Sequence, residues 1–362
     1  MTEPSGVGST DYLKLTSYFG ERQRSERKFA ADALLELYSE SKVATSVMLR
    51  GIASFGPGHH LRSDETLSMS EDPPVTIVAV DTADKISALA EPAVTMVPRG
   101  LITVERAQLV GPGSAAPTIP ETVKLTLYVG RHHRAAGAPA HREVCAVLHR
   151  NGLAGATVFV GVDGTVHGQR RRARFFGRNT HVPTMIVALG TGEQVAAALD
   201  ELDESLDRPL FTVERAQLCK DNGELLTRPA ALPQTDGAGR ALWQKLMIHT
   251  SEDALHDGAP VHRAIVRELL ESGAARGATV LRGVWGFDGG GMPYGDRFFQ
   301  LGRHVPVTTV VVDAPDRIAA TFDIVDELTD RHGLVSAEMV PAAITVAGSY
   351  RHGSVSLSRY SY

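Results

Sequence analysis

A threefold internal repeat is the feature that most limits how this chain can fold. Each copy opens on a short segment with a Lys-Leu pair near its centre: YLKLTSYFG at 12–20, TVKLTLYVG at 122–130 and WQKLMIHTS at 243–251. The Lys is followed 37 or 38 residues later by the glycine that ends an apolar run, at Gly51, Gly161 and Gly283. A Pro-led β-branched run and a closing strand with a Glu then follow in the same order. Four landmarks repeated three times in one order indicate three copies of one structural unit.

Each copy is predicted to fold as strand–helix–strand–strand–helix–strand. Apolar residues recur at i, i+3 and i+4 before the glycine, as at Leu34, Leu37 and Tyr38 in the first copy, and this spacing is typical of a helix packed on a sheet. A second helical segment follows each Pro-led strand. This order is that of the α+β ferredoxin-like unit. The sequence therefore predicts three tandem ferredoxin-like domains, at 11–110, 121–219 and 241–347.

Three segments have the composition of connections or tails. Residues 110–121 and 219–241 are rich in Gly, Pro and polar residues, as domain boundaries usually are. The last sixteen residues, 347–362, are mostly small and polar, and we predict a loosely ordered tail there.

Composition narrows the class of protein. Hydrophobic residues make up 43% of the chain and charged residues 22%, with a formal net charge of −5, which gives no overall attraction to nucleic acid or to an anionic membrane. No segment approaches the roughly 18 continuous apolar residues of a membrane helix, and the first residues carry no secretory pattern. Cys145 and Cys219 are too few for a disulfide framework. We therefore expect a soluble, cytoplasmic protein of several domains.

The segment VMLRGIASFGPGHHLRSDETLSMSEDPPVTIVAVD, at 47–81, resembles the bacterial family called domain of unknown function 190, whose members are PII-like proteins. GATVFVGVDG in the second copy and GATVLRGVWGFDGGG in the third resemble it too. The resemblance covers all three repeats and implies ferredoxin-like subunits of the PII superfamily. Those proteins form trimers, bind nucleotides or other small molecules between subunits, and move a long loop after the second strand.

Three such units in one chain can take the place of three subunits. A four-stranded sheet with two helices on one face leaves its other face uncovered, and an apolar sheet face is usually covered by assembly. Twelve extended linker residues span roughly 40 Å, which is long enough to join neighbouring units. We therefore expect a monomer with internal pseudo-threefold symmetry, that is, an intramolecular pseudo-trimer.

The repeated lysines and glutamates are candidates for a shared role. The first and last strands of a ferredoxin-like sheet are neighbours, so each Lys is expected near one of the repeated Glu residues. Two interpretations follow: cross-strand ion pairs on the assembly face, or a site for a ligand phosphate or carboxylate. The residues concerned are Lys14, Lys124 and Lys245, with Glu105, Glu214 and Glu338.

Candidate ligand-binding residues lie at two repeated places. The turn before the last strand contacts phosphates in nucleotide-binding PII proteins, so the resemblance implies an anion site there; helix capping by Gly and Arg is the structural alternative. The end of the second strand carries Arg-Gly in copies one and three, whereas copy two has Val160, and Pro209 removes a backbone N–H in its turn. The clefts between repeats are thus not expected to be equivalent. The candidates are Arg50, Gly51, Arg99, Gly100, Arg208, Arg282, Gly283, Arg331 and Gly333.

The loops after the second strands are the candidate partner surfaces, because long loops in compact domains are usually functional or disordered. The loop of copy two is rich in Arg and carries two Phe residues, a combination that could bind RNA or phosphate, although nucleic acid is not favoured in an acidic chain. Paired histidines in copy one suggest a metal site as a further alternative. The loop candidates are His59, His60, Arg62, Arg170, Arg171, Arg172 and Arg174.

No catalytic motif with diagnostic spacing occurs in the sequence, so we expect a protein that is not an enzyme. The leading hypothesis is a PII-like signalling or regulatory protein that binds a small anion, such as an adenine nucleotide, between repeats and presents its loops to a partner. The resemblance implies a membrane ion transporter as that partner. The alternatives are a divalent-metal or ion-tolerance protein of the same superfamily, and an RNA-binding protein that uses the Arg-rich loop.

Overall fold

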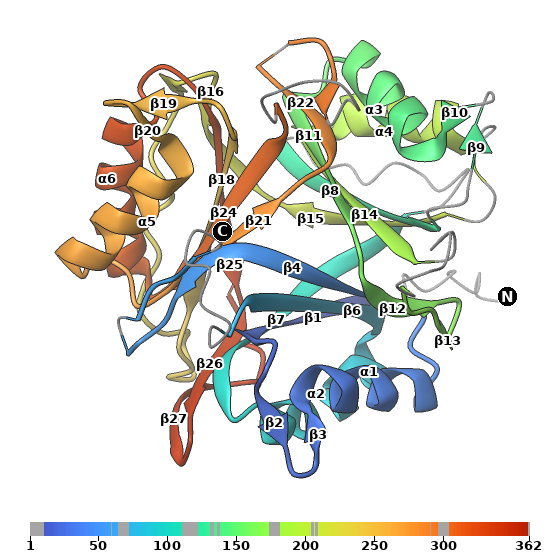
Figure 1. Cartoon of the computed structure of the whole chain (residues 1–362), viewed down its shortest axis with the longest axis vertical. Coiled ribbons are helices and arrows are strands. Elements are labelled where there is room, and N and C mark those ends of the chain that lie inside the picture. The colour runs from blue at the N-terminus through green and yellow to red at the C-terminus, as the bar shows by residue number, and fades with distance from the viewer. Residues whose placement is uncertain are drawn as a thin grey trace, which may run out of the picture.

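The computed structural model shows a mixed α+β chain that is mostly strands, with six helices among the residues it describes (Figure 1). The described residues are 11–58, 60–63, 72–110, 122–130, 134–135, 138–173, 182–203, 206, 209–289, 291–295 and 304–360. The prediction of tandem α+β repeats is confirmed.

Each repeat follows the predicted order of strands and helices. The first contains β1 (Asp11–Gly20), α1 (Ala30–Glu40), β4 (Thr45–Phe55), β6 (Pro74–Thr82), α2 (Ala83–Met96) and β7 (Arg99–Val110). The second contains β8 (Thr122–Gly130), α3 (Ala140–Arg150), β11 (Gly155–Val160), β12 (Asp163–Val166), β14 (Pro183–Thr191), α4 (Gly192–Asp203), β15 (Leu210–Arg215) and β16 (Gln217–Asp221). The third contains β18 (Trp243–Ser251), α5 (Val261–Ser272), β21 (Ala278–Arg282), β22 (Trp285–Asp288), β24 (Pro306–Asp313), α6 (Pro315–Leu328), β25 (Leu334–Val340) and β26 (Ala342–Ala347).

The repeats also contain short strands of two residues and one strand of five residues. They are β2 (Arg24–Ser25), β3 (Lys28–Phe29), β5 (Arg62–Ser63), β9 (Arg134–Ala135), β10 (Ala138–Pro139), β13 (Gln169–Arg170), β17 (Glu224–Leu225), β19 (Leu255–His256), β20 (Ala259–Pro260), β23 (Tyr294–Gly295) and β27 (Tyr350–Ser354).

Each repeat forms one antiparallel four-stranded sheet in which the first strand lies between the third and the fourth. The orders are β4-β6-β1-β7, β11-β14-β8-β15 and β21-β24-β18-β25. The helices bury their apolar stripes on one face of each sheet; in α1 these include Leu34, Leu35 and Tyr38. The helix pairs lie at the outside of the molecule and the sheets face its centre (Figure 1).

The inner faces of the three sheets share one hydrophobic cluster, in addition to a core under the helices of each repeat. Val78 comes from the first repeat, Phe159 and Met185 from the second, and Met247 and Val310 from the third, all of them buried. The uncovered sheet faces of the three repeats therefore cover one another, which removes their apolar side chains from water.

The last strand of each repeat continues into the sheet of another repeat. The end of β7 pairs with β15, β16 pairs with β25, and β26 pairs with β7. The predicted linker 219–241 begins inside β16, at residues 219–221. The prediction of a loosely ordered tail was wrong, because its residues 350–354 form β27 and pair with β26 as a hairpin, and the tail is described up to Tyr360. Both segments are ordered at these residues because their backbone N–H and C=O groups form hydrogen bonds with the edge of a sheet.

The second strands also meet across repeats, in an equivalent register at each junction. We call these junctions the 1–3 seam (β4 with β21), the 2–3 seam (β11 with β22) and the 1–2 seam (β4 with β12). Ala278 pairs with Phe55, Ala156 with Phe287, and Ser46 with Thr165. Each repeat thus contacts both of the others through backbone hydrogen bonds.

Substitution of Gly286 is expected to open the 2–3 seam. A Cβ atom at Gly286 would lie 2.2 Å from the carbonyl oxygen of Ala156, and that carbonyl belongs to the paired strand β11. Gly286→Ala should therefore lower the free energy of unfolding by about 1–3 kcal/mol, measured by urea denaturation. Ser54→Ala, at the equivalent place in the 1–3 seam, is the control and should change it by less than about 1 kcal/mol; equal losses would contradict the close approach.

Candidate functional site: a central Lys–Glu ring and a cleft at the 1–3 seam

The repeated lysines and glutamates meet at the centre of the molecule. Each Lys pairs in register with the Glu of its own repeat, at nitrogen–oxygen distances of 2.8–3.0 Å. Each also contacts the Glu of one other repeat: Lys14 with Glu214, Lys124 with Glu338, and Lys245 with Glu105. The six groups therefore alternate in a closed Lys–Glu ring. The prediction of cross-strand ion pairs on the assembly face is confirmed.

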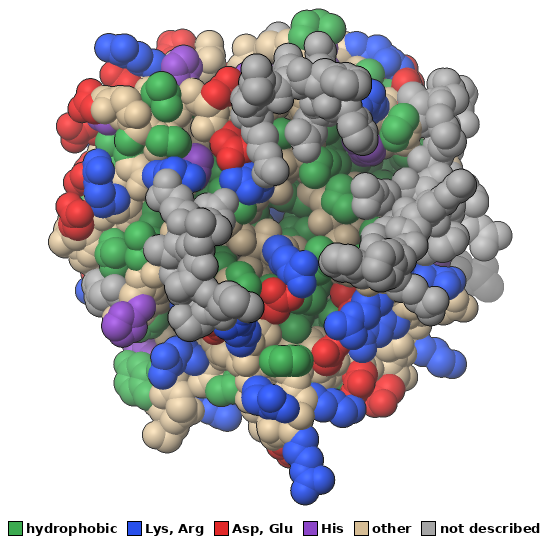
Figure 2. Space-filling model, viewed as in Figure 1, with side chains coloured by type: hydrophobic (Ala, Val, Ile, Leu, Met, Phe, Trp, Pro, Cys, Tyr) green, Lys and Arg blue, Asp and Glu red, His purple; other side chains and the backbone are tan. Residues whose placement is uncertain are grey.

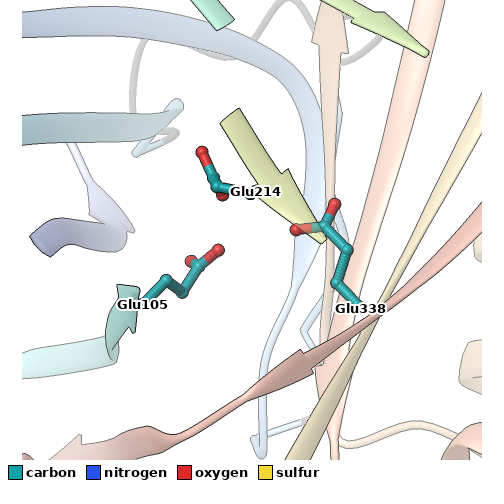
Figure 3. Close-up of side chains that lie close together, drawn as sticks. All are labelled: Glu105, Glu214 and Glu338. Atoms are coloured by element: carbon teal, nitrogen blue, oxygen red, sulfur yellow. The ribbon is translucent and has the colours of Figure 1, made fainter. Parts of the chain in front are cut away.

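The Lys–Glu ring is buried and balances its own charge. All six side chains are at most 8% exposed, and a buried charge is tolerated only with close partners. The three carboxylates point toward one another (Figure 3), with ligand oxygens within 4.8 Å, a spacing that could hold a metal ion. Each carboxylate already contacts two ammonium groups, so the lysines supply the positive charge that a metal would bring.

Loss of one ammonium group should destabilise the fold strongly. Lys245→Met leaves Glu105 and Glu338 with one Lys each in a dry environment, so we expect a loss of about 3–5 kcal/mol in the free energy of unfolding. Lys28→Met removes the exposed pair with Glu36 and should change it by less than about 1 kcal/mol. Urea denaturation measures both variants, and a Lys245→Met protein as stable as Lys28→Met would refute the structural role of the ring.

The Lys–Glu ring should also make the fold sensitive to acid. Burial by itself raises the pKa of Glu338, but Lys124 and Lys245 outweigh burial and hold the pKa at about 2. A carboxyl with a depressed folded pKa stabilises the fold above its unfolded pKa, near 4.5, and this contribution disappears as pH falls toward 2. Unfolding free energy should therefore fall between pH 4.5 and 2. In Lys245→Met the folded pKa of Glu338 moves back toward its unfolded value, so the loss of unfolding free energy over this pH interval should be smaller; an equal loss in both proteins would contradict this assignment.

A cleft of about 120 Å³ lies at the 1–3 seam. Its floor is apolar and aromatic, with Phe19 and Phe55 from the first repeat and Trp243, Val310 and Val312 from the third. Figure 2 shows one face of the molecule, with hydrophobic side chains near its middle and many Lys and Arg side chains over the first repeat below them. Such a floor favours the apolar or planar part of a ligand.

Basic groups surround this cleft from both repeats. Arg99, His60 and Arg62 come from the first repeat and Arg276 from the third. The Arg276 guanidinium lies 5.8 Å from the Trp243 ring centroid, and its Nε is 3.2 Å from Asp313. Backbone N–H groups of Arg276 and Ala314 also donate to the Asp313 carboxylate, each at 2.8 Å. Asp313 thus orients Arg276 beside an aromatic surface.

Part of the predicted ligand set reaches this cleft. Arg99 and Gly100, predicted to lie in the turn before the last strand, line it from the first two residues of β7, and the Arg99 N–H donates to Gln23 Oε1 at 3.0 Å, so this amide already has an acceptor. His60 and Arg62 line it from the loop after β4. The loop and the turn, predicted separately, therefore border the same space.

Other predicted ligand residues lie elsewhere. Arg50 pairs with Glu21 at 2.6 Å and Arg282 with Glu252 at 2.5 Å; neither lines the cleft. The glycines after them, Gly51 and Gly283, lie where a Cβ would come within 2.9 Å of a neighbouring repeat. Arg331 is 82% exposed beside Asp330, and Gly333 has φ of +111°. His59, Arg174 and Arg208 lie outside the described residues.

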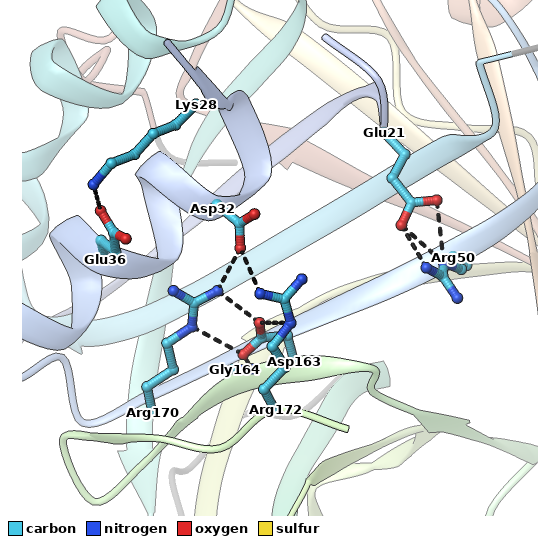
Figure 4. Close-up of polar contacts among 9 residues, drawn as sticks. All are labelled: Glu21, Lys28, Asp32, Glu36, Arg50, Asp163, Gly164, Arg170 and Arg172. Carbon is cyan, nitrogen blue, oxygen red and sulfur yellow. Dashed lines mark hydrogen bonds and ion pairs between the residues drawn. The ribbon is translucent and has the colours of Figure 1, made fainter. Parts of the chain in front are cut away.

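The Arg-rich loop of the second repeat binds the first repeat over the described residues (Figure 4). Arg170 contacts Asp163 at 2.7 Å and Asp32 of α1 at 2.8 Å, and Arg172 contacts Asp32 at 3.1 Å. Arg171 donates to Gln169 at 2.7 Å. Arg170 and Arg172 therefore carry out a structural role at the 1–2 seam, and their charge is compensated there.

Sequence reasoning missed Trp243 and Arg276. A signal existed for Arg276, because it stands before the repeated Gly-Ala-Thr-Val segment, where copy two has Ala154. An unmatched cation at a repeated position indicates a role that only one copy performs. Trp243 carried a similar signal, because it opens the third repeat at the position where Tyr12 and Thr122 stand in the other two.

The repeats match the DUF190 family, described as "Uncharacterized ACR, COG1993", over residues 12–109, 122–218 and 243–342. The chain therefore belongs to this family and contains three copies of its domain. It is similar to a UPF0166 protein of Aquifex aeolicus (strain VF5), with 30% identity over 103 residues, which are 28% of this chain and 94% of that relative. That relative thus has the length of about one repeat.

Among the described residues, the helices are too short or too polar to cross a membrane.

Proposed function

We propose that this chain is a PII-like regulatory protein whose three ferredoxin-like units form an intramolecular pseudo-trimer. The sheet order of each repeat, the shared central cluster and the closed Lys–Glu ring support this architecture. Each Lys takes its second partner from another repeat, so the charges are fully compensated only when all three repeats are together.

We propose that the cleft at the 1–3 seam binds a small anion with a planar part, such as an adenine nucleotide. The observation that carries this proposal is the combination in one cleft of an aromatic floor with basic groups from two repeats. Guanidinium groups offer forked donors to phosphate and stack on flat surfaces. Asp313 already accepts from Arg276 and two backbone amides, so we propose binding and no reaction at this cleft.

The loop after β4 would carry the signal. Residues 54–58, His60 and Arg62 line the cleft, so a ligand seated there contacts the start of the loop. Ordering of a segment by a ligand is a common switching device. We propose that the loop then contacts a protein partner, for which a membrane ion transporter is the candidate that the family resemblance implies.

Binding of ATP, ADP, AMP and cyclic AMP tests the ligand proposal. In a Trp285→Phe protein, Trp243 is the remaining tryptophan and should report a ligand in the cleft by fluorescence. Arg99→Ala should weaken binding of the best nucleotide about tenfold or more, because a hydrogen bond to a charged group contributes about 1.5–3 kcal/mol.

Arg331→Ala is the matched control, since it removes an exposed Arg from the equivalent turn of the third repeat. It should leave the affinity unchanged. The proposal fails if millimolar concentrations of all four nucleotides change neither the Trp243 fluorescence nor the melting temperature, because a bound ligand must stabilise the fold.

A further inference from the structure

The three seams are built alike but differ in what they enclose. Phe55, Phe287 and Thr165 occupy equivalent positions in the registers of the 1–3, 2–3 and 1–2 seams. Equivalent seams in an assembly of identical subunits would hold three equal sites. In a single chain each seam has its own sequence, so the side chains at equivalent positions show which of them keeps a site.

The 2–3 seam is filled by its own side chains. The equivalent space there measures about 10 Å³ and is lined by His249, Phe287 and Leu334 among others. Ala154 stands at the place of Arg276, and Gly190 at the place of Asp313. The cation and the carboxylate that orients it are both missing from this seam, and the remaining space is about that of one water molecule.

At the 1–2 seam, polar contacts between the repeats occupy the positions equivalent to the cleft. Thr165 Oγ1 donates to Ser46 Oγ at 3.0 Å, and its backbone N–H donates to the same oxygen at 2.9 Å. Arg170 adds its contact with Asp32. Ala44 stands at the place of Arg276, although Asp81, which accepts from the Ala44 N–H, is retained. A separate cavity of about 660 Å³ at this seam is lined by Arg50 and Arg172, whose charges are paired with Glu21 and Asp32.

Glycines allow the strands to close at these two seams. A Cβ at Gly164 or Gly286 would lie 2.0 or 2.2 Å from a carbonyl oxygen of the facing strand, on Ser46 or Ala156. The 1–3 seam has Ser54 at the equivalent position, and a side chain there is incompatible with so close an approach. The cleft at the 1–3 seam, which has Ser54, measures about 120 Å³, whereas the equivalent space at the 2–3 seam, which has Gly286, measures about 10 Å³.

We propose that the chain has one ligand site, at the 1–3 seam, and that Arg276 and Trp243 make it specific for an anion with a planar ring. This inference rests on the proposed function and adds its stoichiometry and its selecting residues. The 1–2 and 2–3 seams are structural joints in which the equivalent positions no longer provide the Arg and Trp. A single chain would therefore bind one ligand, without cooperativity between sites.

Isothermal titration of the full chain with ATP tests this inference, with ADP and inorganic phosphate as further probes. We expect one ATP per chain. Arg276→Ala should weaken ATP binding at least tenfold and Arg276→Lys less. Trp243→Phe should weaken ATP but leave any inorganic phosphate binding unchanged, because only ATP has a ring to stack. Circular dichroism and urea denaturation identify any variant that fails to fold, and Arg99→Ala then provides an independent test of the location.

The outcomes separate the inference from the proposed function. Two or three ATP molecules per chain would overturn the single site while the ligand-binding function stands. One ATP whose affinity is unaffected by Arg276→Ala and Arg99→Ala in folded proteins would overturn the location. If ATP, ADP and inorganic phosphate all fail to bind, the proposed anion-binding function fails, and this inference fails with it.

Discussion

The Lys–Glu ring is the interaction on which the arrangement of the repeats depends. A single repeat would place one ammonium beside one carboxylate on an open sheet face. Assembly buries both groups and supplies each with a second partner from another repeat. Buried ion pairs often contribute little net stability, but an unmatched member is costly. The ring therefore favours arrangements in which all three sheets meet in this register over other ways to cover the same apolar faces.

Backbone pairing between strands of different repeats also couples the repeats. The core of the first repeat includes Ile344 and Val346 of β26, that of the second includes Val110 and Phe287, and that of the third includes Cys219. Each core thus takes residues from other repeats. The exchange also pairs sheet edges that would otherwise present free N–H and C=O groups. The repeats are therefore separate in the sequence, but each folded core and sheet includes residues of a neighbouring repeat.

Much of the fold could be predicted because the same landmark residues recur at a fixed spacing in all three copies. Lys14 and its equivalents, and the glycines at 51, 161 and 283, mark the same strands in every copy. The exchange of last strands could not be predicted in this way. Segments such as 219–241 have the composition of linkers, and their pairing depends on backbone groups that every residue carries.

The site was harder to predict than the fold. Arg50 and Arg282 recur because each pairs with a Glu in the turn after the opening strand, so their repetition reflects structure. Arg276 and Trp243 occur in one copy only, and a search for shared features passes over them. In a chain of diverged repeats, recurrence indicates architecture, and a unique residue in a shared position is the better indication of binding.

The Aquifex relative is about as long as one repeat, which is roughly one third of this chain. Joining three copies fixes their number and order, so dilution cannot separate them. Two junctions are crossed by the chain itself, between repeats one and two and between two and three, and the junction of three with one closes without a covalent connection. The contact between repeats three and one is made by the pairing of β26 with β7 and of β21 with β4. Because the chain tethers these two repeats, their effective concentration toward each other is high and does not depend on the protein concentration.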